Sequence, residues 1–294
     1  MKMKKVGMHV HSTVSDGKDR PSVLVGKAIR EGLAAICLTD HDLYHGIEEF
    51  RAEAEKCGLE TIPAMEVSAH WQNRSYVHLL AYGIDFPRKE PLLREKLGKN
   101  WEAHNGVYEE IMKRLFTHYS MDFPRETMKE KIGQLGPINF SMPTIRFLEG
   151  HLGLEKGEFR RMAYDGHFTF ENPVLLGLYL SVEEAMEAIE SAGGKAVLAH
   201  PGLFRVYTIA GRASVKDFED LFFLLMDLGL SGIETYYPEH DREQTEYFEK
   251  LAMRCGLWKT AGSDYHGEYK PNCGLSMPGM SYEDFLRFKS FCEK

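Results

Sequence analysis

The sequence predicts an α/β fold in which a β/α barrel is interrupted by a helical insertion. Short apolar runs alternate with amphipathic helical patterns in residues 1–89 and again in residues 179–294. Strands that alternate with helices of this length are typical of βα units, and therefore of a largely parallel sheet or barrel. The alternation stops in residues 90–178, where helical patterns cover residues 91–119 and 141–153. We expect one barrel domain from the first two segments and a helical insertion from the third.

Composition and charge are those of a globular protein with a sizeable core. Hydrophobic residues make up 43% of the 294 residues and charged residues 27%, which are ordinary values. The net charge of −8 argues against stable binding of nucleic acid, which requires a basic surface. No apolar run reaches the length of a membrane span, no signal-peptide core is visible, and the five cysteines lack CxxC spacing. We therefore expect a cytoplasmic protein without membrane contact.

The first β/α portion begins with a strand that carries two histidines. Alternation in residues 4–10 places apolar side chains on one face and His9 on the other, and His11 continues the polar face. Pro21 and Gly32 suit the first turn and the stop of the helix that follows. The remaining patterns of this portion predict strands at residues 34–39, 59–69 and 75–83 and a helix at residues 46–58.

The second β/α portion repeats the alternation from residue 181 onwards. Ser181 suits the cap of its first helix, and Gly194 suits the stop after it. The patterns predict helices at residues 181–194, 215–229 and 242–256 and strands at residues 195–202, 230–237 and 257–264.

Nine histidines and acidic residues fall on these strands or just after them. In a parallel β/α barrel the carboxyl ends of all strands open onto one face, where active sites are built. Sets of His, Asp and Glu without cysteine suit zinc, manganese or iron, and a bridging carboxylate suits more than one ion. The candidate metal ligands are His9, His11, Asp16, His41, Glu66, His78, His200, Asp264 and His266.

Each candidate ligand has an ordinary explanation when it is taken alone. Asp16 precedes Gly17, a pair that usually forms a turn. The coincidence of nine such groups favours metal, because burial of so many polar groups without an ion would be costly. Glu234 and His240 follow the remaining strand and could lie near the site without belonging to it. The other histidines, His45, His70, His104, His118, His151 and His167, are expected at the solvated surface.

The chain resembles the PHP (polymerase and histidinol phosphatase) superfamily, and most of all its stand-alone metal-dependent phosphoesterases. The motifs that carry the resemblance occur in order over both β/α portions: HVHSTVSDG, LTDHD, AMEVSA, VHLLAYGID, LAHPG, GIETYYPEH and TAGSDYHG. That branch includes nucleoside-monophosphate and 3′,5′-bisphosphonucleotide phosphatases. The resemblance implies a distorted (β/α)7 TIM-like barrel, an insertion that covers the active site, and two or three divalent ions.

The resemblance also implies how the ligands divide among the ions. Glu66 would bridge the first ion to the second. The first would be held by His9, His11, Glu66 and Asp264, the second by Glu66, His78 and His200, and the third by Asp16, His41 and His266.

The implied function is hydrolysis of a small organic phosphate, either a nucleotide-type monoester or a cyclic phosphodiester, with release of phosphate. A hydroxide that bridges two ions would be the nucleophile. Asp264, His266 or a water on the third ion would protonate the leaving group. Arg146, Arg205 and His240 are candidate substrate contacts.

Two departures from the family pattern leave the substrate open. Met142 and Thr144 flank Pro143 where the phosphatases carry Arg and His to grip a phosphate, and Arg205 is displaced from the His-Pro-Gly segment. Loss of the monoester grip would fit a cyclic phosphodiester. The alternatives are an amidohydrolase-like metal hydrolase, which shares the His-x-His strand, and a metal-binding PHP module without catalysis.

Overall fold

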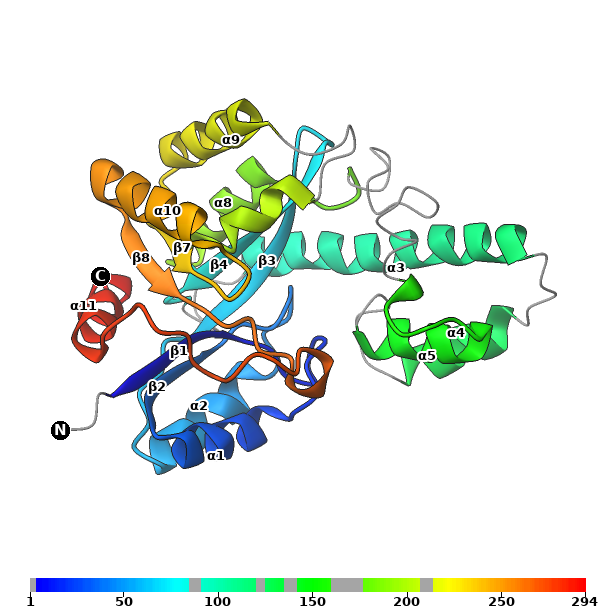
Figure 1. The fold of residues 1–294 in the computed structure, drawn as a ribbon, viewed down its shortest axis with the longest axis horizontal. Coiled ribbons are helices and arrows are strands. Elements are labelled where there is room, and N and C mark those ends of the chain that lie inside the picture. Colours follow the sequence, from blue (N-terminus) through cyan, green and yellow to red (C-terminus); the bar gives the residue numbers. More distant parts are fainter. Residues whose placement is uncertain (1–3, 85–90, 120–124, 135–141, 160–176, 207–213) are drawn as a thin grey trace.

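The structure is a computed structural model, and it describes residues 4–84, 91–119, 125–134, 142–159, 177–206 and 214–294. Strands lie at the centre of the molecule and helices pack around them, so the predicted α/β class is confirmed (Figure 1). The main sheet has the order β5-β3-β4-β6-β7-β8, and β1 and β2 form a second, two-stranded sheet. The strands are β1 Lys5–Val10, β2 Leu33–Leu38, β3 Ala64–Trp71, β4 Ser75–Tyr82, β5 Leu180–Ser181, β6 Lys195–Leu198, β7 Gly232–Tyr236 and β8 Trp258–Ala261.

One strand runs against the expected parallel arrangement. Strand β4 is antiparallel to both β3 and β6, whereas the pairs β1–β2, β3–β5, β6–β7 and β7–β8 are parallel. No helix separates β3 from β4, and their turn places both Gln72 and Asn73 at positive φ, as in the tight turns that suit the twist of a hairpin. Glu66 and His78 therefore lie inside the two hairpin strands and not at strand ends.

The two sheets are joined by single bridges. Val10 pairs with Tyr265, Ala35 with Glu60 and His41 with Glu66, all in parallel orientation. These bridges place the β1–β2 pair between the β8 and β3 sides of the main sheet. Closure into a seven-stranded barrel stays a prediction, because the described ladders form two sheets.

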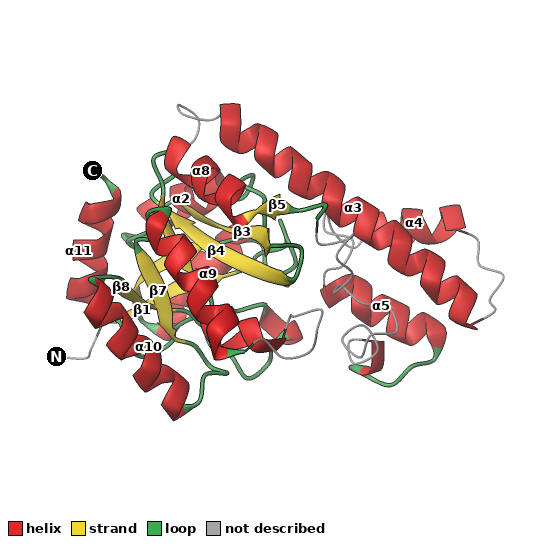
Figure 2. Cartoon of the chain, turned by 90° about the horizontal axis from the view of Figure 1, so that it is seen from above, coloured by secondary structure: helices red, strands yellow, loops and turns green. Residues whose placement is uncertain are grey.

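Helices cover the outer faces of the strands (Figure 2). Pro21 occupies the first turn of α1 and Gly32 ends it at φ 74°, as expected. Ser181, Ser214 and Asp241 each form a capping box at the start of a helix. The helices of the two β/α portions are α1 Pro21–Glu31, α2 Ile47–Lys56, α8 Val182–Ser191, α9 Val215–Asp227, α10 Arg242–Cys255 and α11 Tyr282–Cys292, with short 3₁₀ turns η1 Pro201–Val206 and η2 Gly267–Tyr269.

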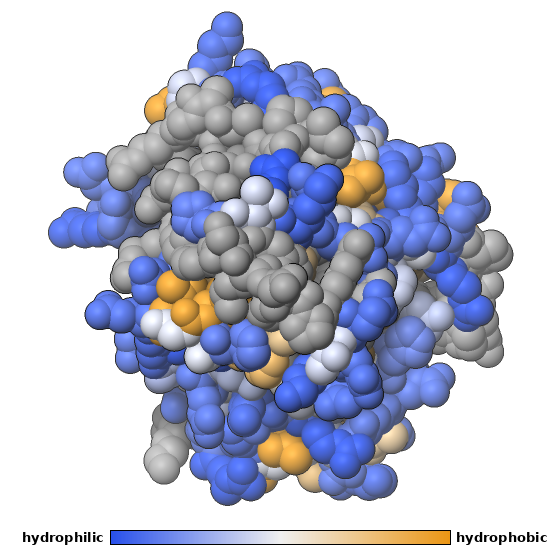
Figure 3. All heavy atoms as spheres, turned by 90° about the vertical axis from the view of Figure 1, so that its right-hand side faces the viewer, coloured by the Kyte–Doolittle hydropathy of each residue, from blue (hydrophilic) through white to orange (hydrophobic). Residues whose placement is uncertain are grey.

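The described residues from 91 to 152 lie almost wholly in three helices. Helix α3, Pro91–Tyr119, begins beside β3 and extends past the strands, and α4 Arg125–Gly133 and α5 Met142–Leu152 lie beside its far half (Figures 1 and 2). The described surface at this end is mainly hydrophilic, with small separate apolar patches (Figure 3). Among the described helices, none combines the length and apolar character needed to cross a bilayer.

Strand β3 shows how the core positions the site. Met65 and Val67 pack into the large apolar cluster under α8 and α9. Glu66 and Ser68 alternate with them and, although fully buried, face the opposite side. The period-2 alternation therefore separates a wholly apolar layer from a layer that carries polar groups.

The register of the His-x-His strand depends on one hydroxyl, which gives a first prediction. The N–H of Val10, between the two histidines, donates to Thr39 Oγ1 at 3.0 Å, and both residues are fully buried. Thr39→Val keeps the side-chain shape but leaves that N–H unpaired, which costs about 1–3 kcal/mol. We expect a lower urea midpoint for Thr39→Val than for Thr39→Ser, which keeps the hydroxyl. Equal midpoints for the two variants would contradict this role.

Candidate metal centre

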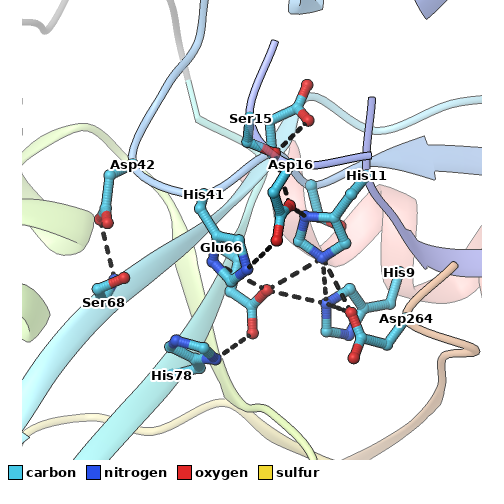
Figure 4. Close-up of polar contacts among 12 residues, drawn as sticks. His9, His11, Ser15, Asp16, His41, Asp42, Glu66, Ser68, His78 and Asp264 are labelled. Carbon is cyan, nitrogen blue, oxygen red and sulfur yellow. Dashed lines mark hydrogen bonds and ion pairs between the residues drawn. The ribbon is translucent and has the colours of Figure 1, made fainter. Parts of the chain in front are cut away.

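The nine candidate ligands lie together in one cluster, although they come from segments spread over the chain. Figure 4 labels seven of them, all except His200 and His266. His9 and His11 come from the end of β1, Glu66 from β3 and His78 from β4. The others follow strands, with Asp16 in the loop after β1, His41 after β2, His200 after β6, and Asp264 and His266 after β8.

The first group of donors surrounds a single point. His9 Nε2 lies 3.0 Å from both His11 Nε2 and Glu66 Oε2, and His11 Nε2 lies 3.1 Å from Glu66 Oε2. Asp264 Oδ1 lies 3.1 Å from His11 Nε2 and 3.4 Å from His9 Nε2. Donors around a tetrahedral ion with bonds of about 2.0–2.1 Å are separated by about 3.3 Å. The four atoms are therefore spaced to hold one ion.

The second group meets the other oxygen of Glu66. Glu66 Oε1 lies 2.9 Å from His78 Nδ1 and 3.0 Å from His200 Nε2, and those two nitrogens are 3.3 Å apart. His41 Nδ1 lies 3.3 Å from Glu66 Oε2. Because each carboxylate oxygen of Glu66 faces a different set of histidines, this residue is placed to bridge two ions.

The third group gathers around Asp16. Asp16 Oδ2 lies 3.1 Å from His266 Nε2 and 3.9 Å from His41 Nε2, while Asp16 Oδ1 lies 3.5 Å from His11 Nδ1. This geometry differs in two ways from the division of ligands that the resemblance implies. His11 also belongs to the group around Asp16, and His41 belongs both to this group and to the group of Glu66 and His78.

The buried state and the charge of these side chains suit divalent cations. His41 Nδ1 and His78 Nε2 are buried, and neither has a hydrogen-bond partner among the described residues, although His41 Nδ1 lies 3.3 Å from Glu66 Oε2. Burial opposes charging of His11, but its hydrogen bonds with Asp264 and Glu66 raise its pKa to about 10. Burial also opposes ionisation of Glu66, yet the surrounding histidines hold its pKa well below the usual value. A proton held by His11 would be displaced when a metal ion binds.

The loop that carries Asp16 is held by Asp40. Asp40 Oδ1 accepts from the Ser12 N–H at 2.7 Å and from Ser15 Oγ at 2.6 Å, and Oδ2 accepts from Ser12 Oγ at 2.7 Å. A Cβ at Gly17 would collide with the His11 carbonyl, so only glycine allows this tight turn. Asp16-Gly17 is thus both a turn and a source of a candidate ligand.

Glu234 is the residue that sequence reasoning left undecided. It is fully buried, its Oε1 accepts from His9 Nδ1 at 2.9 Å, and its Oε2 accepts from the His200 N–H at 2.8 Å. A Cβ at Gly262 would collide with the Glu234 carboxylate. Glu234 therefore fixes the tautomer of His9 so that Nε2 faces the donor cluster. Its position after β7 is the signal that could have assigned it.

A cation supports the outer oxygen of Asp264. Lys270 Nζ lies 2.9 Å from Asp264 Oδ2 and donates to Tyr237 Oη at 2.7 Å, while that hydroxyl donates to the same Oδ2 at 3.0 Å. Burial raises the pKa of Tyr237, so the phenol stays protonated. The Lys270 side chain is 23% exposed. Sequence reasoning missed Lys270 because its contact with Asp264 arises only from the path of the loop after β8.

The three candidate substrate contacts stay predictions. His240 Nδ1 lies 3.0 Å from the Thr235 carbonyl and its Nε2 accepts from the Gly202 N–H at 3.1 Å, so both ring nitrogens engage backbone. Arg146 lies on α5, and the described residues include no ion pair between it and a candidate ligand. The side chain of Arg205 lies outside the described residues.

The expectation of a surface role is wrong for His104. This residue is 7% exposed, its Nε2 donates to Asp42 Oδ2 at 3.0 Å, and its Nδ1 lies 3.1 Å from Tyr179 Oη. It lies on the part of α3 that packs against the strands, a contact that the helical pattern alone does not reveal. His45, His118 and His151 are exposed, His70 is partly buried, and His167 lies outside the described residues.

Comparison with known proteins agrees with this site. Residues 7–120 match the PHP domain. A phosphoribosyl 1,2-cyclic phosphate 1,2-diphosphodiesterase of Eggerthella lenta is 27% identical over 92% of this chain and 98% of its own. A 3′,5′-nucleoside bisphosphate phosphatase of Chromobacterium violaceum is 28% identical over 90% of this chain and 88% of its own. A 5′-3′ exoribonuclease of Escherichia coli is 27% identical over 88% of this chain and 84% of its own.

A solved structure extends the likeness to the whole chain. A Bifidobacterium adolescentis protein described as a metal-dependent phosphoesterase superposes with a TM-score of 0.77, 26% identity and coverage of 99% of this chain and 97% of its own. The fold, the donor cluster and these relatives define a phosphoesterase, a hydrolase of phosphoric esters. The chain carries a PHP domain at residues 7–120, and the resemblance to PHP phosphoesterases that its motifs predict is confirmed.

The role of Glu234 gives a second prediction. Both Glu234 oxygens accept hydrogen bonds, but in Glu234→Gln the amide NH₂ group cannot accept one. Either the bond from His9 or the bond from the His200 N–H is therefore lost. Loss of such support for a ligand weakens metal binding by about 10–100-fold. Competition titration with a metallochromic chelator measures this change, and Glu243→Gln, an exposed position on α10, is the matched control. Unchanged affinity in Glu234→Gln would disprove the role.

Proposed function

We propose that this phosphoesterase hydrolyses a small phosphorylated substrate, a nucleotide-type monoester or a cyclic phosphodiester, and that the nine clustered ligands hold two or three divalent ions within a distorted (β/α)7 barrel. The observation that carries the proposal is the position of Glu66. Its two buried oxygens each face histidines, and together they lie within 2.9–3.3 Å of ring nitrogens of five histidines. Two ions a few ångströms apart are the typical catalytic arrangement for phosphoryl esters.

Charge supports a phosphorylated substrate. Three of the nine ligands are carboxylates and six are histidines, so two or three divalent ions would leave the pocket net positive inside an acidic chain. When bound, the ions would activate water near neutral pH and neutralise charge on the phosphate oxygens. The chain's own part is to orient the donors, through Glu234 for His9 and through Lys270 and Tyr237 for Asp264.

The proton for the leaving group has two candidates within the chain, Asp264 and His266. His266 Nδ1 donates to the Asp264 carbonyl at 2.8 Å, and its Nε2 lies 3.1 Å from Asp16 Oδ2. Both Asp264 oxygens are also engaged, one by the histidine donors and the other by Lys270 and Tyr237. This geometry favours ligand roles for both residues over proton donation by either.

A ribonucleotide end is a second candidate substrate. The Escherichia coli relative is a 5′-3′ exoribonuclease, so the expectation that this chain does not bind nucleic acid is not supported. An exoribonuclease cleaves phosphodiester linkages and a bisphosphate phosphatase cleaves a monoester, so both hydrolyse phosphoric esters. A short oligoribonucleotide therefore belongs in the substrate panel, beside an amide and a lactone for the amidohydrolase alternative.

Product formation tests the proposed function: inorganic phosphate is measured for the monoesters, and chromatography detects the phosphomonoester that forms when a cyclic phosphate or an oligoribonucleotide is hydrolysed. The purified chain, supplied in turn with Mn²⁺, Zn²⁺ and Fe²⁺, is assayed on nucleoside monophosphates, 3′,5′-bisphosphates, cyclic phosphates and the oligoribonucleotide. We expect turnover on at least one phosphoester, complete loss with a chelator, and a loss of more than about 10³-fold in kcat for His9→Ala, because an activated water depends on the ion. His118→Ala, at an exposed histidine, is the control. A fully metal-loaded chain that hydrolyses only the amide or lactone would refute the proposal.

A further inference from the structure

Asp42 is buried directly beside a candidate metal ligand. It follows His41, is 3% exposed and has φ 50°. Its carboxylate accepts three hydrogen bonds, from the Ser68 N–H at 2.9 Å, from Asn100 Nδ2 at 2.8 Å and from His104 Nε2 at 3.0 Å. The first of these contacts is drawn in Figure 4. Donors on two different elements therefore converge on one carboxylate.

Two of the three donors come from the insertion. Asn100 and His104 are four residues apart on α3 and so share one helix face. Asn100 is fully buried and fully paired, because Nδ2 also donates to the Ser68 carbonyl at 2.7 Å and Oδ1 accepts from the Leu180 N–H at 2.9 Å. We call Asp42, Asn100 and His104 the Asp42 clamp. It ties α3 to the loop after β2, to β3 and to β5.

Backbone hydrogen bonds and strand pairing connect the Asp42 clamp to three candidate ligands. The Asp42 N–H donates to the Glu66 carbonyl at 2.8 Å, and the Glu66 N–H donates to the Asp40 carbonyl at 3.2 Å, so His41 is held alongside Glu66. Ser68, which donates to Asp42, is the cross-strand partner of His78. The clamp thus acts on the group formed by His41, Glu66 and His78.

The backbone at Asp42 requires this support. A non-glycine residue in the left-handed region persists only where its surroundings fix it. The three hydrogen bonds of the Asp42 carboxylate supply that constraint, and two of them depend on α3. Removal of the α3 donors would leave a buried carboxylate under-paired and allow the loop that carries His41 to relax.

We propose that Asn100 and His104 are positioning residues, through which the inserted helix α3 fixes His41 beside Glu66 and completes the metal centre. The insertion is then a structural part of the centre. The proposal rests on the metal centre of the proposed function, but it concerns how the ligands are held and not which substrate is cleaved.

Metal content and amide exchange test the Asp42 clamp without reference to turnover. Full-length wild type, Asn100→Ala, His104→Ala and His104→Gln are equilibrated at one fixed free Mn²⁺ concentration, and bound metal is counted by mass spectrometry. We expect both alanine variants to hold at least one ion per chain fewer than wild type. His104→Gln keeps a donor toward Asp42 and should recover most of the loss.

Hydrogen exchange of the metal-free chains gives the second readout. The Ser68 amide donates to Asp42 itself, so its exchange should be at least ten-fold faster in the alanine variants. Glu102→Ala, at an exposed position on the same helix, should match wild type in both readouts. If Asn100→Ala does not melt cooperatively, it is not folded and its data are set aside. The comparison of His104→Ala with His104→Gln then tests the proposal by itself.

Wild-type metal content in a folded His104→Ala would overturn the proposal, whatever its exchange rates. Equal metal loss in His104→Ala and His104→Gln would also overturn it, because the donor would then be irrelevant. A wild-type chain that loads metal but cleaves no phosphoester would refute the proposed function and leave both readouts of the Asp42 clamp intact.

Discussion

The cost of burying ionisable groups together is the constraint on which this structure depends. Glu66 is fully buried and lies within 2.9–3.3 Å of ring nitrogens of five histidines, namely His9, His11, His41, His78 and His200. A buried charge is tolerated only when it is paired or coordinates a metal. Strand pairing, turns and buried polar contacts around the centre all serve to keep these donors close despite that cost.

Three buried carboxylates that are not themselves candidate ligands hold the segments that carry ligands. Asp40 holds the loop of Asp16, Asp42 holds the loop of His41, and Glu234 holds His9 and His200. Each is buried and takes its hydrogen bonds from backbone N–H groups or from neighbouring side chains. Because metal binding depends on the exact position of each donor, these three carboxylates are expected to affect metal affinity although they do not bind the metal.

The sequence reveals the ligands far better than their supports. His9 and His11 are two apart on a strand, and Asp264 and His266 end another, so local pattern and strand order bring them together. The direction of β4 depends on a short turn that lacks the Asn-Gly signal of a hairpin. Glu234, Lys270 and His104 act through contacts with residues distant in the chain, which no local pattern encodes.

The single bridges between the two sheets give the donor cluster a further property. His9, His11, Asp16 and His41 belong to the β1–β2 side, whereas Glu66, His78 and His200 belong to the main sheet. Each ion held by both sets would cross-link two sheets that otherwise share few backbone hydrogen bonds. The free energy of metal binding would then stabilise the association of the two sheets. Metal binding would thereby stabilise the folded chain, quite apart from its part in turnover of substrate.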